Sequence, residues 1–192
     1  MISKALLAQH SINLLVLKLD HNPIGSEGLK ILAKGISQNK QLVMVSLTFC
    51  SIDETAAESL FEIAVYQFST LVELNLSGNP IREAGVIRLC QGLACSKSLE
   101  KIQVGACQFS DTEEVLDAFE FCMTENTKLS KYDLKHNNIT DGGVERLATI
   151  IKSAPHVFEV EVSEWINEET MAKLTEALLG NKPKKGKKGK KK

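Results

Sequence analysis

The side chains best suited to metal binding or nucleophilic chemistry are four histidines and five cysteines spread along the 192 residues. They are His10, His21, His136, His156, Cys50, Cys90, Cys95, Cys107 and Cys122. Imidazole and thiolate groups hold zinc when several converge, and a cysteine becomes a nucleophile when a base lies beside it. The cysteine spacings match neither a zinc site nor a disulfide framework, and no cysteine has an evident His or Asp partner. No phosphate loop is visible, because Gly186 and Gly189 stand within a run of lysines. The sequence therefore predicts a non-catalytic protein without cofactor or metal.

The elements that would position these side chains repeat along the chain. Six segments share a Leu-x-x-Leu-x-Leu pattern at spacings of 28 to 30 residues, starting at Leu14, Leu42, Leu71, Leu99, Leu129 and Val157. A fixed period of this size is typical of a solenoid. In the third copy, Leu74 and Leu76 alternate with polar residues as in a half-buried strand, and the apolar residues that follow have helical spacing. His21 and His136 hold the same place in distant copies, so we expect them to lie too far apart to share a metal.

One polar position recurs after each of the first five predicted strands, at Asn22, Cys50, Asn79, Cys107 and Asn137. We expect these side chains to form a ladder that bonds the open backbone groups of the turn and of the next coil. A glycine recurs six residues after each of the three asparagines, which predicts close packing of the helix start on the turn beneath it. Glu113 holds this place in the fourth and longest copy, where we expect a displaced helix.

These motifs resemble the leucine-rich repeat family, and the long unit with Gly-Val or Gly-Leu after the turn is similar to its ribonuclease-inhibitor-like class. The matching stretches are residues 22–32, 79–89 and 137–147. The resemblance implies an α/β solenoid, a horseshoe arc of about six strand–turn–helix repeats, with a parallel sheet on the concave face and helices on the convex face. We expect this domain over residues 14–181, after a partial helix at the N-terminal edge (1–13) and before a disordered lysine-rich tail (182–192).

The residues between the inward leucines are expected to line the concave face. The candidate partner surface comprises Val16, Lys18, Met44, Ser46, Phe49, Glu73, Asn75, Lys101, Gln103, Lys131 and Asp133. Val16, Met44 and Phe49 form its most apolar part, and no aromatic cluster of the hot-spot type is expected. The half helix predicted for residues 1–13 leaves the first strand poorly supported. A docked partner, self-association, a truncated start or a short capping helix would each explain this edge.

The net charge of −1 conceals a strong asymmetry. Residues 182–192 hold eight lysines and no acid, which leaves 15 basic and 24 acidic residues, so the tail carries +8 and the body −9. The candidate polyanion-binding lysines are Lys182, Lys184, Lys185, Lys187, Lys188, Lys190, Lys191 and Lys192. Acidic tubulin tails, nucleic acid, an anionic membrane or the body's own acidic end could attract them. The lack of interleaved aromatic residues makes nucleic acid an unlikely partner.

These features favour a non-catalytic protein–protein interaction module, a structural or adaptor subunit of a large intracellular assembly. The chain is similar to small leucine-rich repeat proteins of ciliary and flagellar axonemes, which implies a cytoplasmic, cytoskeletal location with the tail on acidic tubulin tails. One alternative is a Ran-type GTPase-activating protein or another small-GTPase regulator, although no arginine follows the first strand. Another is a nuclear or RNA-associated adaptor. Free thiols indicate a reducing compartment, and no apolar run approaches the ~20 residues of a membrane span.

Overall fold

The computed structural model describes residues 2–7, 13–66 and 68–182. It contains one parallel sheet of six three-residue strands in the order of the sequence. The strands are β1 (Val16–Lys18), β2 (Met44–Ser46), β3 (Glu73–Asn75), β4 (Lys101–Gln103), β5 (Lys131–Asp133) and β6 (Glu159–Glu161). The helices are α1 (Ile2–Leu7), α2 (Gly25–Gln38), α3 (Ala57–Val65), α4 (Arg82–Cys95), α5 (Glu113–Glu125), α6 (Asp141–Ser153) and α7 (Glu168–Asn181), with a 3-10 turn, η1 (Glu54–Ala56), before α3.

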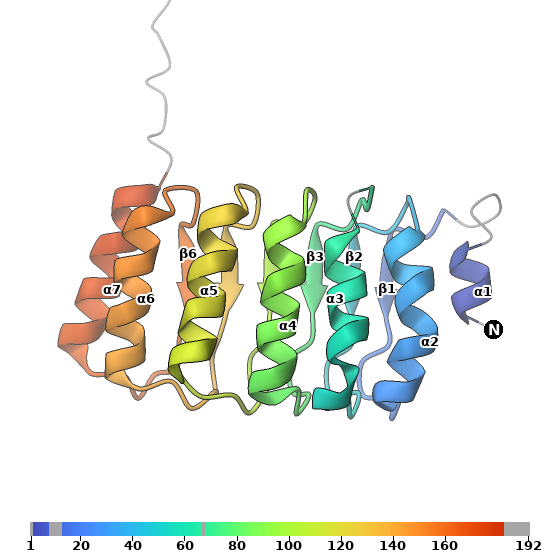
Figure 1. The fold of residues 1–192 in the computed structure, drawn as a ribbon, viewed down its shortest axis with the longest axis horizontal. Helices are drawn as coiled ribbons and strands as arrows, with labels where there is room; N and C mark the ends of the chain where they lie inside the picture. Colours follow the sequence, from blue (N-terminus) through green and yellow to red (C-terminus); the bar gives the residue numbers. More distant parts are fainter. Residues whose placement is uncertain (1, 8–12, 67, 183–192) are drawn as a thin grey trace, which may run out of the picture.

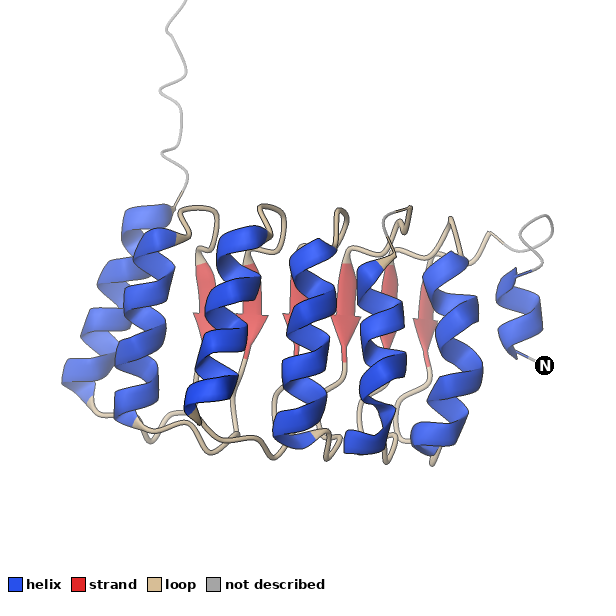
Figure 2. Cartoon of the chain, in the orientation of Figure 1, coloured by secondary structure: helices blue, strands red, loops and turns tan. Residues whose placement is uncertain are grey.

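The helices form one layer and the strands the other, side by side along the molecule (Figures 1 and 2). Each repeat is one coil of an open solenoid, so the predicted α/β architecture is confirmed. The core lies between the layers, where the central residue of every strand is buried: Leu17, Val45, Leu74, Ile102, Tyr132 and Val160. Adjacent coils share this core, because no single coil can bury its own apolar stripe.

The turns that contain cysteine are longer than those that contain asparagine. Helix α4 begins three residues after Asn79, whereas α5 begins six residues after Cys107. Ser51 and Gln108, each directly after a ladder cysteine, have left-handed backbone angles, with φ of 58° and 63°. In the turns of Asn22 and Asn79 the second left-handed residue comes later, at Gly25 and Arg82, where the helix begins. The helix expected to be displaced in the fourth copy does start late, but the second copy shares the same feature, so Glu113 alone does not cause it.

The glycines at the helix starts contact the turn beneath them. A Cβ built at Gly143 would lie 2.6 Å from the Cβ of Asp111 in the preceding coil, and one at Gly85 would lie 3.0 Å from the Cβ of Ile81. The approach at Gly143 is closer than a side chain tolerates, so that position requires glycine, and at Gly85 a side chain would require Ile81 to shift. Of the helices in the described part of the chain, none combines the length and the apolar character that a bilayer span requires.

Candidate protein interface

The ladder residues join each coil to the coil before it. The Asn79 side-chain amide donates to the carbonyl oxygens of Leu76 and Leu47, each at 2.7 Å. Its oxygen accepts the backbone N–H groups of Cys50 at 2.8 Å and Ile52 at 3.1 Å. The expectation that the ladder bonds the next coil is therefore wrong in direction, because the open groups within reach of Asn79 belong to the preceding turn.

Asparagine and cysteine have different tasks in this ladder. The Cys107 thiol donates to the Leu76 carbonyl oxygen at 3.4 Å, as the Asn137 amide donates to that of Val104 at 2.8 Å. A thiol is a poor acceptor, whereas the asparagine side-chain oxygens accept: that of Asn137 bonds the N–H of Cys107 at 2.8 Å, as that of Asn79 bonds the N–H of Cys50. Asn22 has no preceding coil among the described residues, and its amide bonds only carbonyl groups of its own turn.

The thiols of Cys50, Cys90 and Cys107 are held in their protonated form. Burial raises the pKa of Cys50, and it raises that of Cys107 to about 12. A hydrogen bond to Cys122, together with burial, raises the pKa of Cys90. These thiols therefore lack the thiolate character of a nucleophile at neutral pH. No three His, Cys, Asp or Glu side chains of the described residues lie where they could hold one metal ion, and His10 falls outside those residues.

The strand register aligns the candidate partner residues in two rows across the concave sheet. One row contains Val16, Met44, Glu73, Lys101, Lys131 and Glu159. The other contains Lys18, Ser46, Asn75, Gln103, Asp133 and Glu161. Phe49 lies beyond the end of β2, on the rim of the sheet. The structure thus brings the predicted residues onto one continuous surface, with Phe49 at its margin.

Ser46 is a correction to the predicted partner surface. It is only 3% exposed, and its hydroxyl donates to the Asp20 carboxylate at 2.5 Å. The Thr48 backbone N–H donates to the same oxygen at 2.9 Å. Burial opposes ionisation, but the hydroxyls of Ser46 and Thr48 and the Thr48 N–H outweigh it and lower the pKa of Asp20. Ser46 therefore joins two coils and is not available to a partner.

The C-terminal half of the concave face is a lattice of ion pairs between neighbouring strands. The pairs are Glu73–Lys101 at 3.3 Å, Lys131–Glu159 at 3.5 Å and Lys135–Glu161 at 2.6 Å. Such partly exposed pairs contribute ~0–1 kcal/mol each to stability. Glu159 and Glu161, the acidic residues of β6, are therefore both paired. The lysines of the tail other than Lys182 lie outside the described residues.

The rim at the carboxyl ends of the strands carries aromatic contacts that the sequence did not predict. A left-handed residue recurs at the same place in the first five turns, at His21, Phe49, Gly78, Ala106 and His136. The rings of His21 and Phe49 stack at 5.1 Å with 15° between their planes. A Cβ at Gly78 would lie 2.5 Å from the Phe49 ring, so the absence of a side chain at Gly78 leaves room for this ring. Phe49 remains 55% exposed, as expected of a binding anchor.

The other end of the rim carries His136 and Trp165, whose rings lie 6.3 Å apart. The Trp165 indole N–H donates to the Ile139 carbonyl oxygen at 3.5 Å, yet the side chain is 61% exposed. Trp165 thus contacts the adjacent coil while most of its surface faces solvent. The equivalent places of His21, Phe49 and His136 in their repeats are the sequence signal for this rim.

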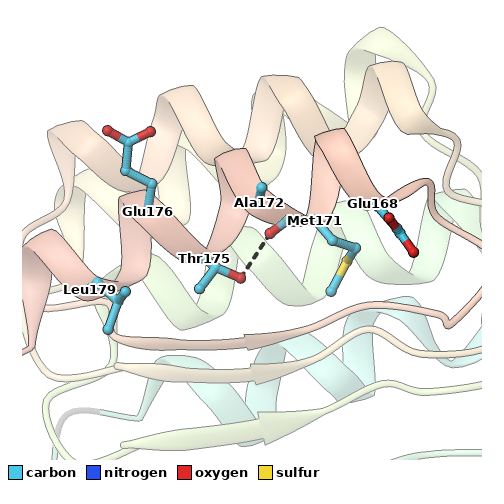
Figure 3. Close-up of a pocket in the computed structure, with 6 residues that line it drawn as sticks. All are labelled: Glu168, Met171, Ala172, Thr175, Glu176 and Leu179. Carbon is cyan, nitrogen blue, oxygen red and sulfur yellow. Dashed lines mark hydrogen bonds between the residues drawn. The ribbon is translucent and has the colours of Figure 1, made fainter.

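Both ends of the solenoid have apolar grooves on the helical layer. The outer face of α7 forms an open groove of about 490 Å³, lined by Glu168, Met171, Ala172, Thr175, Glu176 and Leu179 (Figure 3). The Thr175 hydroxyl donates to the Met171 carbonyl oxygen at 2.8 Å, which satisfies it within the helix. At the other end, α1 and α2 form a groove of about 510 Å³, lined by Ile2, Ser3, Ile24, Gly28, Ile31 and Leu32.

The leucine-rich repeat family matches this chain at residues 10–33, 69–90 and 125–148. The ribonuclease inhibitor of Mus musculus is 29% identical to this chain over 68% of the chain's residues. The match covers 28% of that inhibitor. The chain is a leucine-rich repeat protein of the ribonuclease-inhibitor-like class. This leucine-rich repeat chain is also 32% identical, over 69% of its length, to NACHT, LRR and PYD domains-containing protein 12 of Mus musculus, of which it covers 12%. It therefore spans only about an eighth to a quarter of these relatives.

Solved structures with the same fold include leiomodin-1 actin-binding site 2, with a TM-score of 0.65 and 11% identity. The superposition covers 78% of this chain and 86% of the leiomodin-1 chain. The tropomodulin C-terminal domain of Caenorhabditis elegans has a TM-score of 0.55 and 15% identity, covering 93% of this chain and 90% of that chain. At such low identity, the likeness establishes the fold alone. The repeat frame and the named relatives support a protein–protein interaction module.

Proposed function

We propose that this leucine-rich repeat chain is a non-catalytic adaptor that binds a protein partner through its concave sheet and the adjoining rim. The observation that carries the proposal is the exposed His21–Phe49 stack beside the in-register concave rows. The ribonuclease inhibitor, by its name, acts on another protein, which supports a protein partner here. The buried, protonated thiols offer no alternative chemistry.

The N-terminal half of the concave face is the better binding region. It presents Val16, Met44 and Phe49, whose burial by a partner would contribute about 25 cal/mol per Å² of apolar area. The C-terminal half presents paired charges such as Lys131–Glu159, and desolvating an ion pair opposes binding. We therefore expect the partner to centre on the first three coils.

Phe49→Ala tests this proposal, with Phe121→Ala as the matched control. Both phenylalanines are about half exposed, but Phe121 lies on α5 in the helical layer. Cross-linking and mass spectrometry from native cells would first identify the partner, and calorimetry would then measure its Kd. We expect Phe49→Ala to raise the Kd by roughly 10- to 30-fold and Phe121→Ala to leave it unchanged. Equal effects of the two substitutions, with both variants folded, would overturn the proposal.

In a narrower form of the proposal, the assembly is the ciliary or flagellar axoneme, and the chain is cytoplasmic with its tail on acidic tubulin tails. Its support is the +8 charge of residues 182–192. The test is co-sedimentation of the full chain, and of a chain ending at Asn181, with microtubules. Equal pelleting of both forms would remove the tail from the interaction, and no pelleting of either would refute the tubulin contact.

Actin is the competing filament, because leiomodin-1 actin-binding site 2 shares the fold. Actin filaments therefore belong in the same sedimentation experiment, and binding to them alone would replace tubulin in the proposal. The GTPase-regulator alternative gains no support, since Arg82, the arginine nearest the rim loops, pairs with Glu54 at 3.6 Å. A tagged full-length chain found in the nucleus would favour the nuclear adaptor instead.

A further inference from the structure

The two ends of the helices carry charges of opposite sign. Because the strands are parallel and one helix follows each of them, helices α2 to α7 all begin along one rim of the solenoid and end along the other (Figure 1). The rim where they begin is acidic: α5 starts with Glu113 and Glu114, and α7 starts with Glu168 and Glu169. Acids at these positions face the positive end of the helix dipole, which is a structural reason for the charge of this rim.

The opposite rim, where the helices end, carries one lysine in each of the third to sixth coils. These four lysines, which form a basic rim, are Lys97, Lys128, Lys152 and Lys182. All four are exposed, and none forms an ion pair with a described residue, whereas the lysines at the C-terminal half of the concave face do. Lys97 and Lys128 lie beyond the last turns of α4 and α5, where the effect of the dipole has faded. The helix ends therefore do not account for them.

Asparagine side chains hold the turns of the basic rim side by side. The Asn126 side-chain amide donates to the Ser96 carbonyl oxygen at 3.1 Å, which joins the end of the fourth coil to the third. The Asn181 amide donates to the Ala154 carbonyl oxygen at 3.0 Å, which joins the end of the sixth coil to the fifth. The paired strands β4 and β5 join the fourth coil to the fifth. Successive lysines are thus one coil apart, between the ~4.8 Å of paired strands and the ~8–10 Å of packed helices.

An extended acidic peptide has the spacing that this rim requires. Alternate side chains of an extended segment lie ~6.5–7 Å apart on one face, which is within the range of the lysine spacing. Glu100 and Glu125 are the described acids closest to the row in sequence, and they leave it a net positive charge. Residues 184–192 add further lysines. Nucleic acid fits less well, because the described turns that contain Lys97 and Lys128 have no exposed aromatic side chain on which a base could stack.

We propose that the basic rim binds an extended acidic segment of a partner protein, with one carboxylate beside each of its four lysines. The charge complementarity and the spacing of one lysine per coil select this occupant. A partner acid would give each ammonium group the ion pair that the lysines of the concave face already have. The inference rests on the proposed function as an interaction module, and it adds a surface of the folded body to the lysines of residues 184–192. It uses the opposite rim from the one that carries Phe49.

Fluorescently labelled decaglutamate is the probe, and fluorescence anisotropy at low ionic strength measures its Kd for the full chain. The rim variants are Lys97→Glu, Lys128→Glu and Lys152→Glu. Lys30→Glu is the matched control, because Lys30 is also exposed and its reversal changes the net charge equally, but it lies in the first half of α2, away from the basic rim. Each variant is also made in a full chain whose lysines after Lys182 are changed to glutamine. We expect each rim substitution to raise the Kd roughly three- to tenfold in both chains, and Lys30→Glu to raise it less than about twofold.

Rim substitutions that weaken binding no more than Lys30→Glu does, in variants that circular dichroism shows to be folded, would overturn the inference. Loss of all decaglutamate binding when the tail lysines become glutamine would also overturn it, because the tail alone would then be the site. Tighter binding of decathymidylate than of decaglutamate, with the same dependence on the rim, would assign the rim to nucleic acid and overturn the acidic protein partner.

The native partner separates this inference from the concave proposal. If Phe49→Ala weakens the native partner while Lys128→Glu changes neither that partner nor decaglutamate, the inference about the rim fails alone. If Lys128→Glu weakens both and Phe49→Ala weakens neither, the concave proposal fails and the basic rim stands.

Discussion

Removal of the Asn79 side chain should be the most damaging single change in the ladder. Asn79 is fully buried, and its four shortest side-chain hydrogen bonds join backbone groups of Leu76, Leu47, Cys50 and Ile52. In Asn79→Ala, all four groups stay buried without these partners. At about 1 kcal/mol for each lost bond, which is the lower end of the cost of an unsatisfied buried group, we expect a loss of about 4 kcal/mol in the free energy of unfolding. This is a large fraction of the stability of a domain this size.

Asn22→Ala is the matched control, because Asn22 holds the same place in the first coil but is exposed and bonds only its own turn. We expect it to cost less than about 1 kcal/mol. Urea unfolding followed by circular dichroism would measure both free energies, and the slope would show whether the transition remains two-state. A loss for Asn79→Ala no greater than that for Asn22→Ala would refute the argument that the ladder joins adjacent coils.

Three further changes test other contacts. Gly92→Val should lower the free energy of unfolding by about 1–3 kcal/mol, because a Cβ there would lie 3.0 Å from the Phe61 carbonyl oxygen of α3. Thermal unfolding would measure this loss, and Gly180→Ala, whose new side chain would meet open space, should show no such loss. Because folding lowers the pKa of Asp20, its ionised carboxylate stabilises the folded state above the unfolded pKa, and this stabilisation is lost as pH falls below about 4. Asp20→Asn should therefore flatten the acid limb of the curve of unfolding free energy against pH. In a native thiol-labelling time course, exposed Cys95 should react first, and equally fast labelling of the buried cysteines would contradict the packing.

The repeat spacing was sufficient to predict the strands, their order and the two concave rows. A fixed period leaves one register in which Leu74 and its equivalents all face the core. The direction of the ladder bonds was not predictable, because it depends on where the Asn79 amide points within the turn. The burial of Ser46 was missed for a similar reason, since it follows from Asp20 of the neighbouring coil reaching across the sheet.

The rim aromatics show a different limit. Phe49 and His21 occupy equivalent places in their repeats, so their proximity could have been inferred from spacing alone. Their stacking depends on Gly78, whose missing side chain makes room for the Phe49 ring. The grooves at the two ends have no repeat on their far side in the structure, and the internal pattern of a repeat contains no information about such a neighbour.

The alternation of asparagine and cysteine in the ladder sets the unit by which this protein can be lengthened or shortened. Asn79 follows Asn22 by 57 residues, and Cys107 follows Cys50 by the same number. Excision of the one coil between the two cysteine coils would place the backbone N–H of Cys50 against a thiol, which accepts hydrogen bonds poorly. Duplication or deletion of a pair of coils restores every bond. An engineered change of length should therefore keep two cysteine coils from becoming neighbours, which a step of two repeats always does.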